Sequence, residues 1–511
     1  MSATAPLPAA GTHRATAARS ALWSVAENGG LALISFSSLI IYSRFLSVSD
    51  FGLFSIVLAV IELLTVLVSM LFHDALVQRP DIGEAHYDSA FTATLALSAL
   101  LMAACWLGAP TFAARTGNPS AAMALAWTSL CLPLTAVSAT IVARQRRNLD
   151  FRTLAVRSLV GRTLGAVAGI ALVVAGFSFW GLVAQQVLVV LFGSAVLWLT
   201  CRERPRLRFH WQPFRELIGF GVVAVSVLFI NFSIKRIFVI LSGMALGTHA
   251  AGLLNLSFRA VDTFWSLAAS AISQVALPIL SALRADDSRF KRAFHTASAF
   301  ACVVLYFCFV LIGALSVEVV DLLFGPRWTA IAPFVTLLSL QVLVQARRLL
   351  MAPMLTALGR PRDLLVTQTV ELVFVLVAIL ASGVPSIGWA IGIWVVRECL
   401  GGTVQTALFR RASGIGLAEQ LRVSLMPMLC AGAMLLAVWT ARGVLPATWP
   451  AMARLAVLAP LGTAVYAGCL FLFDRQLLWD LGAFGRAALA RRRKPPPALD
   501  NALADDAKDT P

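Results

Sequence analysis

An apolar run at 216–241 is long enough to cross a bilayer and contains an asparagine, a lysine and an arginine in its second half. Asn231 and Lys235 are four residues apart and share one face of a helix, and Arg236 lies one step around it. Ionisable groups inside a membrane are costly and normally face a protein-lined or watery cavity. Lys235 is only about 10 Å from the end of the run, so its cation could instead snorkel to the headgroups. Both interpretations stay open at this point: an anion-binding cavity or an interfacial contact.

Basic residues also lie inside other apolar runs. The cations that we propose as cavity residues are Arg162, Lys235, Arg236, Arg259 and Arg397. Arginine binds a phosphate group through two parallel hydrogen bonds, and lysine binds it as a point charge. Arg397 is near the middle of its run, where the side chain cannot easily reach either membrane surface, so it ranks highest as a cavity residue. Together the cations indicate an anionic ligand, and a pyrophosphate headgroup would suit them.

Acidic residues occur in the same kind of run. They are Glu27, Glu62, Asp262, Glu371 and Glu398. Burial favours the neutral form of a carboxyl group, so each could hold a transferable proton, or each could pair with an arginine. Asp262 follows Arg259 by three residues on one expected helix, which favours a local ion pair. We therefore expect ion-coupling or ion-pair roles for these acids.

Signatures of catalysis and of metal binding are missing from the sequence. There is no Walker A motif, no His-Glu-x-x-His and no Gly-x-Ser-x-Gly. The eight cysteines lie within or at the ends of apolar runs without a Cys-x-x-Cys, which is typical of small hydrophobic side chains. We expect no catalytic residue, no metal and no cofactor, and hence a protein that is not an enzyme.

The elements that position these residues must be membrane-spanning helices. The chain has 511 residues, of which 59% are hydrophobic and 13% charged, and its mean hydropathy is +0.83. This is far more apolar sequence than a soluble core of the same size would use. Apolar stretches of about twenty residues recur along the chain, and helices satisfy their own backbone hydrogen bonds in lipid. The expected fold class is an all-α polytopic membrane protein.

Fourteen transmembrane helices are expected. Their ranges are 21–46, 51–78, 89–113, 120–143, 154–176, 179–201, 216–241, 250–282, 293–316, 329–351, 364–382, 386–409, 420–440 and 452–473. The expected organisation is a cytosolic N-terminal tail at 1–20, a lobe of helices 1–6 at 21–201, a lobe of helices 7–12 at 216–409, helices 13 and 14 at 420–473, and a basic, largely disordered cytosolic tail at 474–511. The two six-helix lobes would flank a central cavity.

The basic residues follow the positive-inside rule. Most of the basic residues behind the net charge of +16 fall in alternate connections, such as 144–153 and 202–215, and in the tail. This asymmetry places both termini in the cytoplasm. The connection 79–88 fits a cytoplasmic position least well, because it has three acidic residues and one arginine. Acidic residues count little in the positive-inside rule, so the assignment is kept. A nucleic-acid partner is not expected, since the positive charge is explained by membrane topology.

Two short matches suggest an internal repeat. Leu46–Glu62 and Leu246–Asp262 align without a gap, and they share a leucine, a Gly-Leu pair and a terminal carboxylate. A second match pairs Gly176–Ala184 with Gly383–Ile391, with glycines at both matched positions. The offset of about six spans keeps both copies in one orientation, which predicts two lobes related by an axis along the membrane normal.

Several stretches, in this order and spacing, resemble the oligosaccharide flippases of the multidrug/oligosaccharidyl-lipid/polysaccharide exporter superfamily, in particular Wzx-type lipopolysaccharide and exopolysaccharide exporters. The stretches are Arg44-Phe-Leu-Ser-Val-Ser-Asp-Phe-Gly-Leu-Phe, Arg144-Gln-Arg-Arg-Asn-Leu-Asp-Phe-Arg, Gly181-Leu-Val-Ala-Gln-Gln, Ala251-Gly-Leu-Leu-Asn-Leu and Pro278-Ile-Leu-Ser. One departure is Lys235-Arg236-Ile-Phe, where relatives of this type often carry an acidic residue near the end of the seventh span.

The resemblance implies fourteen helices and alternating access by two lobes. The implied cargo is an undecaprenyl-pyrophosphate-linked oligosaccharide, carried from the cytoplasmic to the periplasmic leaflet of the bacterial inner membrane for lipopolysaccharide O-antigen, capsule or exopolysaccharide synthesis. The implied partners are membrane lipids and, beside the transporter, a polysaccharide polymerase and chain-length proteins.

Other interpretations stay open. A cation-coupled drug exporter of the same superfamily would favour an acidic cavity, which the excess of buried arginine and lysine opposes. A polysaccharide polymerase usually needs a sizeable periplasmic loop, and every connection expected here is short. A scaffold for a polysaccharide assembly complex would be distinguished by a transport measurement on the purified protein.

Overall fold

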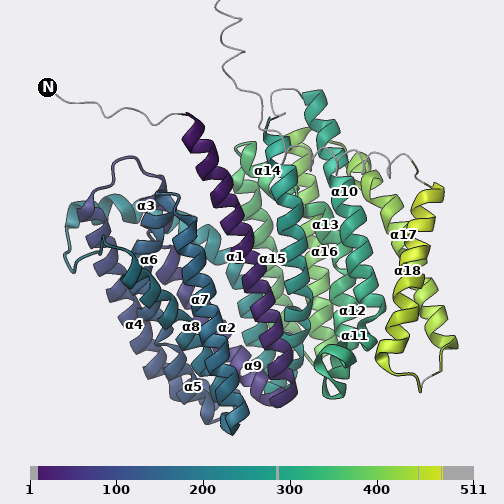
Figure 1. Cartoon of the computed structure of the whole chain (residues 1–511), viewed down its shortest axis with the longest axis horizontal. Helices are drawn as coiled ribbons and strands as arrows, with labels where there is room; N and C mark the ends of the chain where they lie inside the picture. Colours follow the sequence, from purple (N-terminus) through teal and green to yellow (C-terminus); the bar gives the residue numbers. More distant parts are fainter. Residues whose placement is uncertain (1–9, 283–286, 447, 474, 476–511) are drawn as a thin grey trace, which may run out of the picture. The chain divides into compact units, whose positions relative to one another are not determined.

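The computed structural model describes residues 10–282, 287–446, 448–473 and 475, and all regular structure in these ranges is helical (Figure 1). The expected all-α class is confirmed. The expected terminal tails lie outside the described residues, apart from 10–20 and Arg475.

The helices follow one another with short connections. Those up to the middle of the chain are α1 (Ala10–Phe45), α2 (Val48–Met70), α3 (His73–Gln78), α4 (Glu84–Thr116), α5 (Ser120–Thr128), α6 (Cys131–Arg147), α7 (Phe151–Leu172), the π-helix η1 (Val173–Phe177), α8 (Trp180–Thr200) and α9 (Trp211–Ala282). The others are α10 (Asp287–Ala314), α11 (Ser316–Phe324), the 3-10 helix η2 (Pro326–Ile331), α12 (Ala332–Leu340), α13 (Val342–Arg348), α14 (Met351–Ala357), α15 (Pro361–Ser382), α16 (Ile387–Ser413), α17 (Leu417–Val444) and α18 (Ala451–Phe473).

Twelve helical stretches within the described residues are long and apolar enough to cross a membrane. One of them, 229–273, contains parts of two expected spans. Gly247 interrupts the helical backbone there with φ 84° and ψ 172°, so α9 consists of two helices joined at a sharp kink. The first expected span lies in α1 and is not among the twelve. A helix therefore lies over each expected span, but the count of fourteen is not confirmed.

The chain forms two compact units. The first contains the described residues up to 268 together with 316–341 and 361–405, and the second contains 269–315, 342–360 and the described residues from 406 onward. In the first unit α4, α5, α6, α7 and α8 lie side by side (Figure 1). In the second unit α17 packs against α10 and α18. The lobe boundaries expected from the sequence remain a proposal.

Glycines bring α7 and α8 into close contact. Gly161, Gly165 and Gly169 recur every four residues on α7 and therefore share a face. A side-chain carbon at Gly161 would lie 2.7 Å from the carbonyl oxygen of Val189, and one at Gly181 would lie 2.7 Å from the carbonyl oxygen of Gly169. Small residues at such a face let helix backbones approach within a membrane. This packing fixes where α7 and α8 present their polar side chains.

The second pair of matched glycines marks two equivalent turns. Gly176 has φ 93° and Gly383 has φ 62°, a left-handed conformation that glycine adopts without strain. Gly176 lies at the end of the α7 and η1 helix before α8, and Gly383 lies between α15 and α16. The sequence match at these positions therefore corresponds to a shared backbone conformation.

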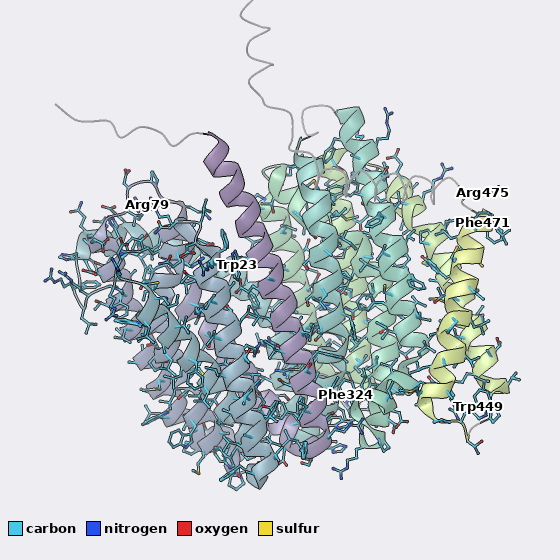
Figure 2. All side chains as sticks on the ribbon, in the orientation of Figure 1. Trp23, Arg79, Phe324, Trp449, Phe471 and Arg475 are labelled. Atoms are coloured by element: carbon cyan, nitrogen blue, oxygen red, sulfur yellow. The ribbon has the colours of Figure 1, made fainter. Side chains whose placement is uncertain are left out.

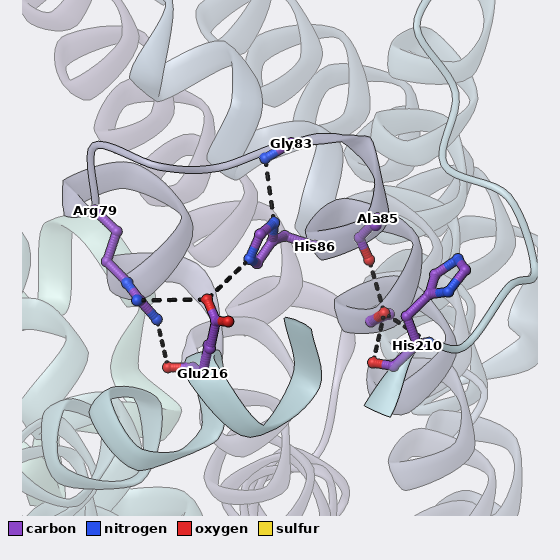
Figure 3. A network of polar contacts seen from close by, with 7 residues as sticks. Arg79, Gly83, Ala85, His86, His210 and Glu216 are labelled. Carbon is purple, nitrogen blue, oxygen red and sulfur yellow. Dashed lines mark hydrogen bonds and ion pairs between the residues drawn. The ribbon is translucent and has the colours of Figure 1, made fainter. Parts of the chain in front are cut away.

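Polar contacts fasten the start of α9 to α3 and α4 (Figure 3). Arg79 donates a hydrogen bond to the carbonyl oxygen of Glu216 at 2.6 Å, and its guanidinium is 3.6 Å from the Glu216 carboxylate. The Gly83 N–H donates to Nδ1 of His86 at 3.2 Å, which assigns the ring proton to Nε2, 3.4 Å from the same carboxylate. The end of α3 and the first turn of α4 thus share one acidic partner on α9.

The connection before α9 runs along α4. Its backbone is held by side chains of α4 in four hydrogen bonds: the Arg206 N–H to Asp88 at 2.7 Å, the His210 N–H to Ser89 at 3.0 Å, Ser89 to the His210 carbonyl at 3.2 Å and Thr92 to the Arg208 carbonyl at 3.1 Å. Because the backbone is used in this way, the arginine side chains of the connection remain exposed.

Arg144, at the end of α6, is a structural residue. Its side chain is 7% exposed and donates to Glu84 at 2.7 Å and to Glu203 at 2.9 Å. The guanidinium also lies 4.0 Å from the ring centroid of Tyr87. A buried arginine needs such partners on every side. The guanidinium of Arg152 on α7 lies 6.0 Å from the ring centroid of Trp23 on α1, which is labelled in Figure 2.

Candidate functional site

Two adjoining cavities of about 390 and 480 Å³ lie in the first unit between α1, α2, α7, α8 and the two halves of α9. The residues that line both of them are Leu31, Ser35, Leu58, Glu62, Arg162, Arg259 and Thr263. All of these elements are helices of membrane-spanning length or parts of them. The larger cavity also contains Lys235 and Arg236, and we call it the charged cavity; the smaller one reaches α8, and we call it the polar cavity.

Positive charge dominates the lining. The cations are Arg157, Arg162, Lys235, Arg236 and Arg259, and the carboxylates are Glu62 and Asp262. Four of the five cations proposed from the sequence therefore line one continuous site. The excess of cations over carboxylates favours an anionic ligand, because a desolvated cation is stabilised by an opposite charge.

Two of the cations are already paired. Nε of Arg236 on α9 lies 2.7 Å from the Glu62 carboxylate on α2. Lys235 forms an ion pair with Asp262, and its ammonium is 4.5 Å from the ring centroid of Phe258. The sequence left a cavity and an interfacial position open for these cations. The structure has the cavity position, since both side chains line the charged cavity and bind acids there.

The expected local pair of Arg259 with Asp262 is wrong. Asp262 binds Lys235 instead, although the two are 27 residues apart. The physical reason is the kink at Gly247, which reverses the chain and places the first half of α9 beside the second. Sequence spacing along one helix could not reveal this neighbour.

In the charged cavity, Arg162 on α7 and Arg259 on α9 are the guanidiniums left for a ligand. Within the part of the chain that the structure describes, neither donates a hydrogen bond or forms an ion pair. Both face Glu62 electrostatically, but that carboxylate is bound to Arg236. Two unpaired guanidiniums from different helices, which together line one cavity, are suited to grip a phosphate group from two sides.

Arg397 lies outside the lining of both cavities. It is 8% exposed, binds Glu371 at 2.7 Å, and also binds Glu398. Gln341 donates to Glu398 at 3.3 Å, and the guanidinium lies 4.0 Å from the ring centroid of Trp394. Expected as the foremost cavity residue, Arg397 is instead the centre of a buried ion-pair network with two of the expected acids.

Gly401 makes room for that network. An added side-chain carbon at Gly401 would collide with the carboxylate of Glu371. α15 and α16 can therefore approach closely enough for Glu371 to reach Arg397. The remaining sequence candidates are peripheral: Glu27 on α1 is half-buried and acts electrostatically on Arg157, and Asn231 is exposed. Neither lines the two cavities.

Sequence reasoning overlooked several polar residues of the polar cavity. Tyr42, Gln185 and Gln186 line it together with Arg157. The signal for the two glutamines was present, because consecutive amides inside an apolar span are unusual. Tyr42 gave no signal, since a tyrosine near a span end is normally an interfacial anchor.

The fold is similar to that of known membrane transporters. Lipid II flippase MurJ in an inward closed conformation superimposes with a TM-score of 0.70, at 13% identity over 89% of this chain and 99% of that chain. A multidrug resistance MATE family transporter of the MOP superfamily, in an inward-facing conformation, gives a TM-score of 0.54 at 15% identity over 77% of this chain and 95% of that chain. The chain therefore has the MurJ- and MATE-like transporter fold.

The sequence matches are more specific. The chain belongs to the polysaccharide biosynthesis protein family, whose profile matches residues 41–333. The succinoglycan biosynthesis transport protein ExoT of Rhizobium meliloti is 27% identical over 64% of this chain and 66% of that protein. The lipopolysaccharide biosynthesis protein WzxC of Escherichia coli is 21% identical over 62% of this chain and 64% of that protein. The chain thus spans just under two thirds of the length of these relatives. These matches confirm the resemblance to oligosaccharide exporters.

Proposed function

We propose that this protein is a flippase that carries an undecaprenyl-pyrophosphate-linked oligosaccharide repeat unit from the cytoplasmic to the periplasmic leaflet of the bacterial inner membrane. The observation that carries the proposal is the pair of unpaired guanidiniums, Arg162 and Arg259, in a cavity between membrane helices. The succinoglycan and lipopolysaccharide relatives support a polysaccharide precursor as the cargo.

The charged cavity can bind a pyrophosphate because its cations replace the water molecules that hydrate the phosphate oxygens. Arg162 and Arg259 would each donate two hydrogen bonds to phosphate oxygens. Lys235 and Arg236 are balanced by Asp262 and Glu62, so they contribute less net charge. A site with two free cations and two balanced ones can bind a dianionic group without holding it irreversibly, which transport requires.

Transport then requires that the cavity open alternately to the two sides of the membrane. We propose that the two lobes expected from the sequence, 21–201 and 216–409, move relative to one another in this step. We propose a cytoplasmic position for the 202–215 connection and for both termini, which the exposed arginines of that connection support through the positive-inside rule. The product would serve lipopolysaccharide O-antigen, capsule or exopolysaccharide synthesis, with a polymerase and chain-length proteins as partners.

The charge of the cavity argues against the main alternative within the same fold. A transporter of organic cations would need unpaired carboxylates in its cavity to bind the cationic cargo. Here both carboxylates of the lining are bound to cations. We therefore propose a transporter of an anionic lipid and not an enzyme or an exporter of cationic drugs.

A flux measurement tests the proposal. The full chain is reconstituted in proteoliposomes with a fluorescent undecaprenyl-pyrophosphate oligosaccharide, with and without a proton or sodium gradient. We expect movement between leaflets with the unaltered chain and a loss of at least about tenfold in Arg162→Gln and Arg259→Gln, since each removes a charge-assisted phosphate contact.

Arg208→Gln is the matched control, because Arg208 is exposed and lies outside both cavities. It should transport normally. Absence of flux under every gradient in a correctly folded chain would overturn the flippase and favour a scaffold. Normal flux in Arg162→Gln and Arg259→Gln would remove the two arginines from the site.

A further inference from the structure

Several polar groups in the polar cavity have no hydrogen-bond partner within the described part of the chain and are not used by the pyrophosphate site proposed above. Tyr42 is 3% exposed, and its hydroxyl makes no hydrogen bond within the described chain. Nε of Arg157 is also buried and makes no hydrogen bond within the described chain. The side-chain amides of Gln185 and Gln186 also find no partner among the residues described. An unpaired polar group is costly when it is buried, as the Tyr42 hydroxyl and Nε of Arg157 are, and the amides of Gln185 and Gln186 beside them are half-buried. Four such groups in one cavity indicate a polar ligand.

The backbone around these groups leaves space for them. An added side-chain carbon at Gly169 on α7 would lie 2.5 Å from the Tyr42 hydroxyl oxygen and 2.6 Å from Cβ of Gln185. At Gly193 on α8 such a carbon would lie 3.6 Å from Cγ of Arg157. At Gly169 any larger residue would therefore displace the polar groups, whereas the contact at Gly193 is an ordinary van der Waals distance. The polar cavity is lined by α1, α2, α7, α8 and α9, and the four unpaired groups come from three of these helices, α1, α7 and α8.

The chemistry of the lining fits a sugar. A hydroxyl and a carboxamide each both donate and accept hydrogen bonds, and so does each hydroxyl of a hexose. A phosphate accepts but does not donate when ionised, so it would leave the amide oxygens and one role of the tyrosine hydroxyl unused. The polar cavity shares Arg162 and Arg259 with the charged cavity, so a group bound here lies directly beside a phosphate bound there.

We propose that the polar cavity is the glycan subsite, which binds the sugar residue attached to the pyrophosphate through Tyr42, Gln185, Gln186 and Arg157. This inference rests on the proposed function, because it assigns the second cavity by its position beside the pyrophosphate site. It gives the protein a means to distinguish a loaded carrier lipid from an empty one. Tyr42 and Gln185 are the residues that carry this discrimination, and Arg162 and Arg259 serve both lipids alike.

Two lipids that differ only in the sugar test the subsite. The full chain in nanodiscs is titrated with undecaprenyl pyrophosphate and with undecaprenyl pyrophosphate bearing one hexose, and each Kd is measured by native mass spectrometry. We expect the unaltered chain to bind the hexose-bearing lipid about tenfold tighter, as two or three added hydrogen bonds would give. Tyr42→Phe and Gln185→Leu should reduce this preference to about twofold or less and leave the Kd of the sugar-free lipid unchanged.

Tyr87→Phe is the control, because Tyr87 is a buried tyrosine outside both cavities. If the unaltered chain has no preference, or if Tyr42→Phe and Gln185→Leu keep it, the subsite is wrong while the flippase stands. If the unaltered chain binds neither lipid, the proposed function itself fails.

Discussion

Gly52 on α2 and Gly252 on α9 stand at matched positions of the two similar sequence stretches, and each lies against the backbone of the other's helix. A side-chain carbon at Gly52 would collide with the carbonyl oxygen of Thr248, and one at Gly252 would collide with that of Val48. The contacts are reciprocal, because Val48 and Thr248 are themselves matched residues. Reciprocity of this kind arises when two equivalent surfaces meet across a twofold axis. It supports the proposal that the two lobes are related copies.

The crossing predicts a stability effect. Gly52→Ala and Gly252→Ala should each lower the free energy of unfolding by about 1–3 kcal/mol, because the new methyl group forces two helix backbones apart. The measurement is the midpoint of thermal aggregation in detergent. Gly108→Ala on α4 is the control, since nothing lies near its missing side chain, and it should be neutral or slightly stabilising. Unchanged midpoints in both crossing variants would show that the helices do not need this approach.

The repeat also shows what the sequence could reveal. Gly52 and Gly252 were found by alignment alone, and the helical class followed from hydropathy, because a backbone in lipid has few alternatives. Four of five expected cations line the cavities for the same reason: an ionisable group in a membrane span must face the protein interior.

Partner choice could not be predicted. Lys235 and Asp262 meet because the chain reverses at Gly247, and Arg397 is neutralised by Glu371 from another helix. Both contacts depend on helix rotation and packing, which the spacing of residues along one helix does not encode. The unpaired state of Tyr42 likewise depends on its neighbours on α7 and α8.

Because Arg397 is the centre of a buried ion-pair network, substitution of Arg397 should lower the stability of the fold and should not act selectively on ligand binding. Arg397→Ala leaves Glu371 and Glu398 without their shared cation and should cost about 3–5 kcal/mol. We expect poor yield and a clearly lower thermal midpoint, with Arg397→Lys intermediate because an ammonium keeps the charge but not the forked geometry. A stable Arg397→Ala protein that selectively loses the sugar-lipid flux would contradict this and return Arg397 to the site.

Arg144 and Arg79, which bind different carboxylates, should differ in the same thermal measurement. Arg144 is 7% exposed and binds two carboxylates, whereas the side chains of Arg79 and Glu216 are 33% and 38% exposed. Arg144→Ala should therefore lower the thermal midpoint strongly, while Arg79→Ala should cost about 1 kcal/mol or less, because solvent screens exposed pairs. Equal effects of the two substitutions would mean that the Arg79 contact in Figure 3 holds α9 more firmly than its exposure suggests.

The position of Glu62 leads to a prediction about the affinity of the charged cavity for undecaprenyl pyrophosphate. Its carboxylate binds Arg236, and it is also the carboxylate that interacts most strongly with Arg162 and Arg259 by electrostatics. Glu62→Gln keeps the shape of the side chain but removes that charge, so three guanidiniums then act on a bound anion. We expect undecaprenyl pyrophosphate to bind about tenfold tighter, equal to about 1.4 kcal/mol, and to be released more slowly, so that flux at saturating lipid falls.

Titration of the lipid at two ionic strengths measures this effect. The gain in affinity should shrink at high salt, because part of the cavity is open to solvent and its charges are screened. Asp81→Asn is the control, since Asp81 is an exposed acid outside the cavities. Weaker binding in Glu62→Gln would show that the carboxylate holds Arg236 in a position the ligand needs. In that case the ion pair organises the site, and the net charge of the cavity does not set the affinity.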